Sequence, residues 1–194
     1  MIQRLLNLLI LPSVIQGTTK IACPGSPSWQ HAKCNMVVTF PSTSCTDVHN
    51  EIASRIAGLS SWIDPHNGGT YSSSRDEVDE STGTRYVEGS HDTGDGKYTD
   101  KFTLVLMESS SSEVVGEDST TSGSCTMTAC SESQVTSVLD FSTNYCNLRN
   151  LYCNSDDGCP IVNWDLEHEE KRNDCWQSNA KKCIVSKEAT FAQE

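Results

Sequence analysis

The sequence predicts an α+β domain in which a helix packs on a curved antiparallel sheet. Three observations support this fold class. They are an amphipathic segment at residues 46–59, a series of strand-like segments between residues 70 and 130, and ten cysteines. A helix with a single apolar face must bury that face, and a sheet formed by the neighbouring strands is the natural surface for it.

The clearest helix is predicted at residues 46–59, after a short strand at residues 36–40. Its apolar residues recur at helical spacing and form one face: Val48, Ile52, Ile56 and Leu59. Ser44 or Thr46 is placed to cap the first turn, and Gly58 is a residue typical of a helix end.

The central part of the sequence favours antiparallel strands. We expect a strand at residues 70–74, a hairpin formed by residues 84–87 and 97–107 around Asp95-Gly96, and a strand at residues 125–130. Phe102, Leu104 and Leu106 alternate with polar or smaller residues, so they face one side of the hairpin. Residues 109–124 are almost entirely Ser, Thr, Gly and acidic residues, and we expect them to form a mobile loop.

A second helix is predicted near residues 141–153, followed by a cysteine-rich helical tail between Trp164 and Cys183, in which Glu167 and Lys171 have the spacing of a helical ion pair. The order of elements resembles the outline of cystatin-like and NTF2-like folds. This is an analogy of fold outline only, because residues 134–138 lack the glycine and spacing of the cystatin hairpin.

Residues 1–17 have the layout of a secretory signal peptide, with Arg4 before an apolar stretch and Gly17 at a plausible cleavage point. The apolar stretch is shorter than the roughly 20 residues that span a bilayer, and no later segment is longer, so we expect no membrane span. Residues 18–194 are then a single domain, secreted from the cell or held in the lumen of the secretory pathway.

All ten cysteines follow the predicted signal peptide, and an even number in an oxidising compartment indicates up to five disulfides. They are Cys23, Cys34, Cys45, Cys125, Cys130, Cys146, Cys153, Cys159, Cys175 and Cys183. We expect Cys125 and Cys130 to bond elsewhere, because an offset of five puts them on opposite faces of a strand. A turn separates Cys153 from Cys159, so that pair is compatible with a local disulfide, and at least one of the first three cysteines must pair with the C-terminal half.

Charge and motifs exclude several classes of function. The formal net charge is −12, which argues against nucleic acid and against anionic membrane surfaces. No C-x-x-C pair indicates a zinc site, and we predict neither a metal nor a cofactor. The sequence has no G-x-S-x-G nucleophile motif, and His168-Glu169 lacks the second histidine of a zinc protease motif.

Four polar residues are candidates for catalysis: Asp64, His66, His91 and Asp92. Each carboxylate–imidazole pair lies at the end of a predicted strand, and such groups act as general acid and base when loops bring them together. The alternative is that both aspartates only stabilise turns. Four aromatic residues are candidates for lining an apolar pocket beneath the helix, or else for ordinary core packing: Trp62, Tyr71, Tyr86 and Tyr98.

The leading functional hypothesis is a secreted, non-enzymatic binding protein for a small apolar molecule or a protein partner. It depends on the absence of a catalytic motif beside many cysteines and a long polar loop. The first alternative is a secreted hydrolase or lyase that uses Asp64, His66 and His91. The second alternative is a protease inhibitor that presents residues 109–124, although that segment lacks an apolar or basic anchor residue.

Overall fold

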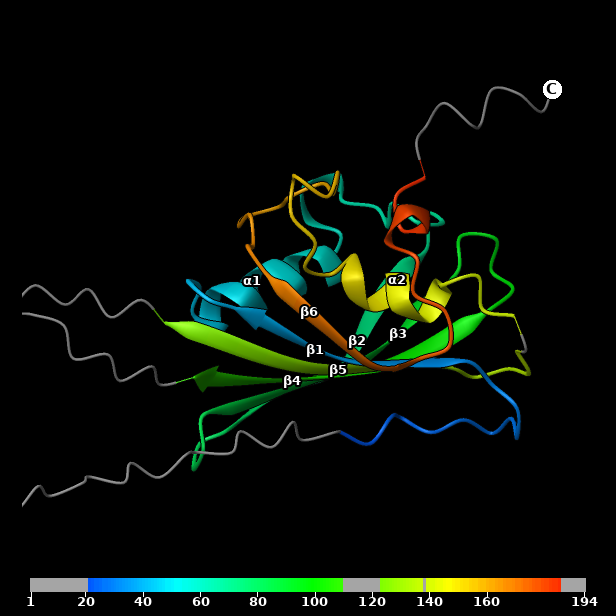
Figure 1. The fold of residues 1–194 in the computed structure, drawn as a ribbon, viewed down its shortest axis with the longest axis horizontal. Coiled ribbons are helices and arrows are strands. Elements are labelled where there is room, and N and C mark those ends of the chain that lie inside the picture. The colour runs from blue at the N-terminus through cyan, green and yellow to red at the C-terminus, as the bar shows by residue number, and fades with distance from the viewer. Residues whose placement is uncertain (1–20, 110–122, 138, 186–194) are drawn as a thin grey trace, which may run out of the picture.

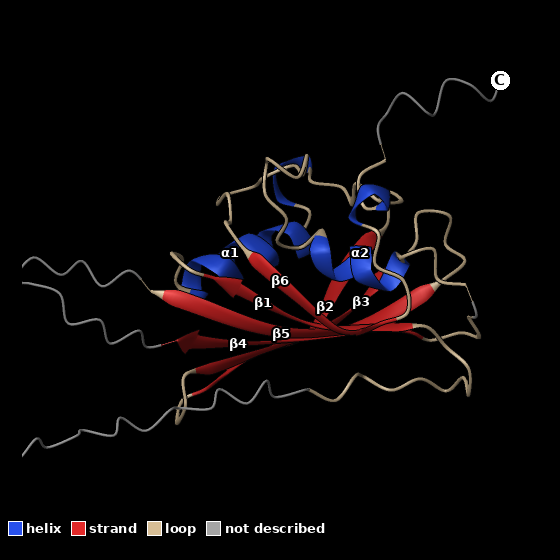
Figure 2. Ribbon diagram, in the orientation of Figure 1, coloured by secondary structure: helices blue, strands red, loops and turns tan. Residues whose placement is uncertain are grey.

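The computed structural model describes residues 21–109, 123–137 and 139–185, so the predicted signal peptide and most of the predicted 109–124 loop lie outside the described residues. A six-stranded sheet has the strand order β2-β3-β4-β5-β1-β6, and every neighbouring pair is antiparallel. The strands are β1 (Lys33–Phe40), β2 (Thr70–Asp79), β3 (Thr84–Asp92), β4 (Thr99–Ser109), β5 (Ser124–Ser133) and β6 (Glu169–Cys175). The helices α1 (Cys45–Ile56) and α2 (Thr143–Arg149) lie on one face of the sheet (Figures 1 and 2), which confirms the α+β class.

The helix α1 follows the prediction closely. Ser44 caps it by accepting a hydrogen bond from the backbone N–H of Asp47, and Val48 and Ile52 are buried against the sheet. The helix ends at Ile56 rather than at residue 59, and the following residues include Gly58 with φ of 63°. Leu59 therefore leaves the apolar face of the helix and becomes exposed in a short 3₁₀ turn, η1 (Leu59–Ser61).

The predicted hairpin is formed by β3 and β4, and the predicted strand at residues 70–74 extends through Asp79 as the edge strand β2. Phe102, Leu104 and Leu106 are buried, as the alternation indicates. With residues of α1, α2 and the central strands they form the apolar core between the sheet and the helices. The opposite face of the sheet is partly covered by an N-terminal arm, residues 21–32, which runs beneath it in blue in Figure 1.

The helix α2 is shorter than predicted. Phe141 and Ser142 have φ of 49° and 72°, a left-handed conformation that no α-helix continues, so the helix begins at Thr143. The predicted helix around Glu167 and Lys171 is wrong, because residues 169–175 form β6. The free edge of β1 supplies backbone partners to this charged segment along its length, a tertiary contact that outweighs the local ion-pair spacing.

Ten cysteines form five disulfides: Cys23–Cys130, Cys34–Cys175, Cys45–Cys125, Cys146–Cys183 and Cys153–Cys159. Cys125 and Cys130 bond elsewhere and Cys153 pairs locally, as expected, while all of the first three cysteines pair with the second half of the chain. None of the disulfides involves β2, β3 or β4. Five disulfides fit an extracellular or secreted protein. Within the described residues, no helix has the length and apolar character needed to cross a membrane.

Candidate functional site

Two of the four predicted catalytic residues meet inside the protein. The Nε2 atom of His91, on β3, lies 3.2 Å from Oδ2 of Asp64, and both side chains have no exposed surface. The amide of Asn150 donates to the other oxygen of Asp64 over 2.7 Å. The ring of Tyr71 packs against the His91 ring with centroids 4.5 Å apart. Asn150 and Tyr71 therefore pack around the Asp64–His91 pair inside the protein.

The carboxyl of Asp64 is held in its charged form. Burial opposes ionisation, but hydrogen bonds from His91 and Asn150, the charge of His91 and the backbone N–H of His66 outweigh it, so the pKa of Asp64 is lowered from its ordinary value. The backbone N–H groups of His66 and Asn67 both donate to Asp64, which is the turn geometry expected from the alternative interpretation of this residue. Asp64 therefore stabilises its own turn and orients His91 at the same time.

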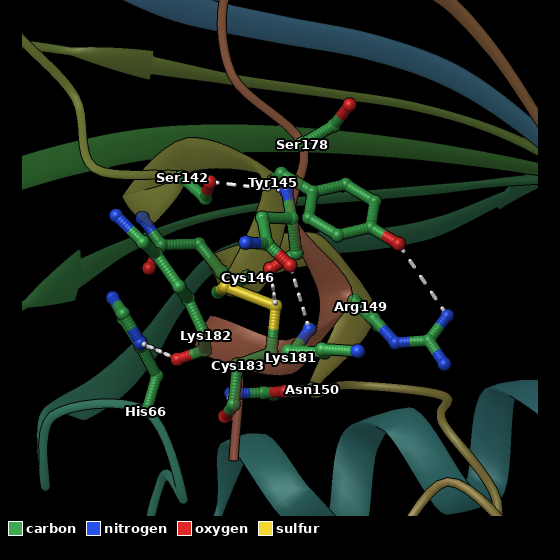
Figure 3. The surroundings of a disulfide bond; sticks show 12 residues. His66, Ser142, Tyr145, Cys146, Arg149, Asn150, Ser178, Lys181, Lys182 and Cys183 are labelled. Carbon is green, nitrogen blue, oxygen red and sulfur yellow. Dashed lines mark hydrogen bonds between the residues drawn. A yellow bond between two sulfur atoms is a disulfide. The ribbon is translucent and has the colours of Figure 1, made fainter. Parts of the chain in front are cut away.

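The other two predicted residues point elsewhere. The Nδ1 atom of His66 lies 2.6 Å from the backbone carbonyl oxygen of Lys182, next to the Cys146–Cys183 disulfide (Figure 3). Because a carbonyl oxygen only accepts, Nδ1 of His66 is the donor. Asp92 accepts a hydrogen bond from the hydroxyl of Thr99 across the β3–β4 hairpin. The structure brings together Asp64 and His91, and it assigns His66 and Asp92 other partners.

A row of polar side chains lies under α2, and the sequence analysis named only two of its residues, Tyr71 and His91. The backbone pairing places Tyr71, His91, Asp100 and Ser133 side by side across β2, β3, β4 and β5. From α2 and its last turn, three buried asparagines reach down to this row: Asn144, Asn147 and Asn150. Their spacing of three residues puts them on one face of the helix, and this spacing is the sequence signal that would have revealed them.

Each asparagine has its own polar partner below the helix. Asn144 donates to Ser133 over 2.9 Å, and Asn147 donates to Asp100 over 2.7 Å. Asn150 donates to Asp64, as described above. Two atoms of this network, Nδ1 of His91 and Oδ1 of Asn147, are buried without a hydrogen-bond partner. A buried water is the usual partner of such atoms.

The predicted aromatic residues divide into two groups. Trp62 and Tyr71 line a hollow of about 340 Å³ between the end of α1 and the start of β2, together with the exposed Ile63. Tyr86 lies under the guanidinium of Arg75, 5.3 Å from its ring centre, and Tyr98 is half exposed in the β3–β4 turn. Only the first two of the four aromatic residues therefore share a hollow.

A larger hollow of about 770 Å³ lies on the outer side of α1. It is an open groove between the helix and residues 162–164, and its lining carries no charged side chain: Asn50, Ala53, Ser54, Leu59, Val162, Asn163 and Trp164. Leu59 and Trp164 are 52% and 47% exposed. A third hollow, of about 520 Å³, lies on the opposite face of the sheet between the N-terminal arm and β2–β4 and is lined by polar residues such as Glu88 and Lys101.

A buried carboxylate fixes one wall of the groove. Glu51 on α1 accepts hydrogen bonds from three consecutive backbone N–H groups, those of Val162, Asn163 and Trp164, over 2.6–2.9 Å. It also accepts one from Arg55, and neither side chain of that pair has exposed surface. Burial disfavours the charged form of Glu51, but the three backbone donors and Arg55 outweigh it, and the pKa of Glu51 is lowered.

A second cluster missed by the sequence analysis joins α2 to β6. Arg149 forms ion pairs with Glu170 and, over 2.6 Å, with Asp157. The hydroxyls of Tyr145 and Tyr152 both donate to Glu170. Tyr152 loses its proton only at very high pH, because burial and then the charge of Glu170 raise its pKa well above the ordinary value. This cluster fastens the edge strand β6 to the helix.

His168, which sequence analysis considered only as part of an incomplete zinc protease motif, belongs to the same cluster. Its side chain is 7% exposed, and its ring packs edge-on against Tyr152 with centroids 5.0 Å apart. Its Nε2 atom lies 3.6 Å from Asp157 and 3.9 Å from Glu170. Even so, among the described residues no group of three or more His, Cys, Asp or Glu side chains is arranged to hold a metal ion.

Comparison with known proteins adds no relative. No protein-family model, no curated protein and no solved structure matches this chain. The cystatin-like or NTF2-like outline therefore stays a prediction, and functional inference depends on the geometry of the sites described above.

Proposed function

We propose that this chain is a secreted binding protein that recognises a protein partner through the groove between α1 and residues 162–164. The observation that carries the proposal is the exposed Trp164 on a segment whose backbone is fixed by Glu51. Tryptophan is enriched among the residues that dominate protein–protein affinity. A segment whose backbone is already held in place also loses little freedom when a partner binds.

The lining of the groove supports a protein partner over a small apolar molecule. Leu59 and Trp164 supply apolar surface, while Asn50, Ser54 and Asn163 supply neutral hydrogen-bonding groups beside it. A central apolar anchor with polar neighbours is the usual composition of a protein interface, whereas sites for small apolar molecules are enclosed. Secretion is supported by five disulfides and by the signal-peptide pattern of residues 1–17.

The test compares Trp164→Ala with Trp176→Ala, because Trp176 is equally exposed, at 48%, and does not line the groove. Each immobilised protein is exposed to the extracellular proteins of its source, and the retained proteins are quantified by mass spectrometry. We expect a protein that the unmodified chain and Trp176→Ala retain, and that Trp164→Ala retains at least about tenfold less. If no retained protein depends on Trp164, the proposal is wrong.

A small apolar ligand is the second candidate, and the specific observation in its favour is the hollow lined by Trp62, Tyr71 and Ile63. Native mass spectrometry of protein purified from its source would detect such a ligand as added mass. Substitution of Trp62 by alanine should then abolish the added mass. A mass equal to that of the chain alone would contradict this version.

The hydrolase or lyase alternative has weaker support. Asp64 and His91 form an acid–base pair, but both side chains are fully buried and none of the three hollows is lined by either residue. The test is to replace His66 and His91 separately by alanine and to assay any hydrolase or lyase activity that the unmodified chain shows. If that activity is unchanged in both variants, neither histidine takes part in catalysis. The inhibitor alternative depends on residues 109–124, most of which lie outside the described residues.

A further inference from the structure

Large apolar side chains project from three chain segments at one end of the sheet. We call this set the end patch; it consists of Trp29, Tyr98, Val135, Leu139 and Phe141, which are 37% to 89% exposed. Trp29 lies in the N-terminal arm, Tyr98 in the β3–β4 turn, and the other three between β5 and α2. In Figure 1 these segments come together at the right-hand end of the sheet.

Hydrogen bonds show that the three segments are neighbours. The backbone N–H of Ser137 donates to the carbonyl oxygen of Gln30 over 3.2 Å, so Trp29 lies beside the segment that follows β5. The backbone N–H of Gln134 donates to the carbonyl oxygen of Thr99, the residue after Tyr98. Five exposed apolar residues from distant parts of the sequence are thus carried by neighbouring segments at one end of the sheet, and a concentration of exposed apolar side chains is typical of an interaction site.

The end patch carries almost no net charge in a chain whose formal charge is −12. Residues 24–32 contain no Asp, Glu, Lys or Arg. Asp140 is the one acid or base of residues 134–142, and it is buried. In the β3–β4 turn, Asp95 and Lys97 neutralise each other at 3.0 Å. The neighbouring ammonium of Lys182 lies over the Phe141 ring, 5.4 Å from its centre.

The segments that carry the end patch are firmly attached. The Cys23–Cys130 disulfide and the contact of His31 with Glu132, at 2.6 Å, hold the arm against β5. Phe141 has a left-handed backbone conformation, which is strained for a bulky residue. Its side chain is 60% exposed. The arm that carries Trp29 is therefore held against β5, and Phe141 is exposed directly before α2.

We propose that the end patch attaches this protein to an uncharged, zwitterionic lipid surface by insertion of its aromatic and aliphatic side chains. Indole and phenol rings favour the boundary between lipid headgroups and acyl chains, and a cation such as Lys182 suits the phosphate of a phosphocholine headgroup. The net charge of −12 disfavours anionic lipids, whereas a neutral patch meets no repulsion from a zwitterionic surface.

A second copy of the chain is the competing occupant. Its surface would have to match side chains that project separately from three segments, and none of the three hollows described above is lined by a residue of the end patch. A lipid interface is soft and accepts projecting side chains in any arrangement. The observations therefore favour a lipid surface over a second copy of the chain. The test also measures whether the chain forms a dimer.

The test uses protein recovered from the medium of expressing cells, so that every variant carries the same N-terminus. Flotation with vesicles of pure phosphatidylcholine is compared for the unmodified chain, for the double variant Trp29→Ser/Phe141→Ser, and for Trp164→Ala as a control of the groove. We expect binding of the unmodified chain and of Trp164→Ala, and binding about tenfold or more weaker for the double variant. Replacing a quarter of the lipid by phosphatidylglycerol should not strengthen binding.

Four results would overturn the proposal. They are absence of binding to phosphatidylcholine, equal binding by the double variant, binding that requires anionic lipid, and a dimer in sedimentation that the double variant abolishes. The substituted side chains are exposed, so the variants should unfold at the same temperature as the unmodified chain. A lipid-attached quencher should also reduce the fluorescence of the unmodified chain more than that of Trp29→Phe.

Discussion

The two helices lie on the same face of the sheet but are held there by different forces. α1 has 12 residues and buries Val48 and Ile52 in the apolar core. α2 has seven residues, and besides Tyr145 and Leu148 its buried face carries Asn144 and Asn147 above polar partners on the sheet. A helix as short as α2 is unstable on its own in water. Specific hydrogen bonds and the Cys146–Cys183 disulfide therefore fix its position, whereas α1 depends more on hydrophobic burial.

The two helices are therefore expected to tolerate different substitutions. Apolar contacts are not directional and survive small shifts, but a buried amide that loses its partner leaves a second group unpaired. The helix α1 is also bonded to the sheet, through the disulfide between its first residue, Cys45, and Cys125 of β5, and it carries the buried Glu51–Arg55 pair. That pair fixes residues 162–164 and so supports the groove.

The largest effect is expected from Glu51→Gln, which would break the buried ion pair on α1. The substitution removes the charge that Arg55 and three backbone N–H groups share inside the protein. Removing one partner of a buried ion pair costs about 3–5 kcal/mol. Chemical denaturation measures the loss, and Glu77→Gln, an exposed carboxylate that pairs with Arg75, is the matched control and should change nothing measurable. A loss as small as that of the control would mean that the Glu51–Arg55 pair contributes nothing to the stability of the protein.

Removal of the Cys146–Cys183 disulfide should have the next largest effect, because this bond attaches α2 to the C-terminal segment. These cysteines are 37 residues apart, and replacing both by alanine should cost about 2–4 kcal/mol of unfolding free energy. Replacing Cys153 and Cys159, which are six residues apart, should cost less, since a shorter loop restrains the unfolded chain less. Equal losses in urea denaturation would contradict this ranking.

The residues just before α2 should make the stability of the protein depend on pH. Burial is the main cause that raises the pKa of Asp140 to about 6, so the folded protein binds this proton more tightly than the unfolded chain does. Stability from this group is present below pH 3.8 and is lost as the pH rises toward 6, by about 3 kcal/mol. Asp140→Asn should remove this decline in denaturation midpoints measured from pH 4 to pH 7.

Asp64 should act in the opposite direction. Its pKa is lowered in the folded protein, so its contribution is present above the ordinary value of 3.8 and is lost as the pH falls below that value. Extending the pH series below 3.8 therefore separates the two carboxyls. If Asp140→Asn leaves the profile between pH 4 and pH 6 unchanged, Asp140 does not have the raised pKa.

The smallest of these effects is expected from Asn147→Ala. This change leaves the buried carboxylate of Asp100 without its amide donor, at a cost of about 1–3 kcal/mol. Asn50→Ala, on the exposed side of α1, is the matched asparagine control and should be nearly neutral. Thermal unfolding of the two variants gives the difference, and an equal shift would mean that the polar contacts of α2 contribute nothing specific.

Sequence reasoning predicted the elements that depend on local pattern. The 3.6-residue recurrence of Val48 and Ile52 predicted α1, and the alternation of Leu104 and Leu106 predicted β4. It failed for residues 169–175, because the spacing of Glu167 and Lys171 is compatible with several conformations. The unoccupied edge of β1 decided the outcome, and an edge is a property of the assembled sheet.

The candidate sites divide in the same way. Asp64 and His91 lie in turn- and strand-forming segments whose meeting could be proposed from sequence, and the structure places them 3.2 Å apart. The support of Trp164 by Glu51 could not be proposed, because 113 positions separate donor and acceptor and nothing local links them. The end patch likewise exists only because three loops share one end of the sheet.

The sequence by itself determined the local features: the cap and apolar face of α1, the hairpin of β3 and β4, and the short Cys153–Cys159 loop. Each depends on residues a few positions apart, where backbone geometry fixes which side chains are neighbours. The tertiary structure alone decided the partners of the buried polar residues, the strand at the edge of β1, the groove beside Trp164 and the position of the end patch. These features depend on contacts between segments that are far apart in the sequence. Such segments become neighbours only when the sheet forms, so no local pattern indicates their contacts.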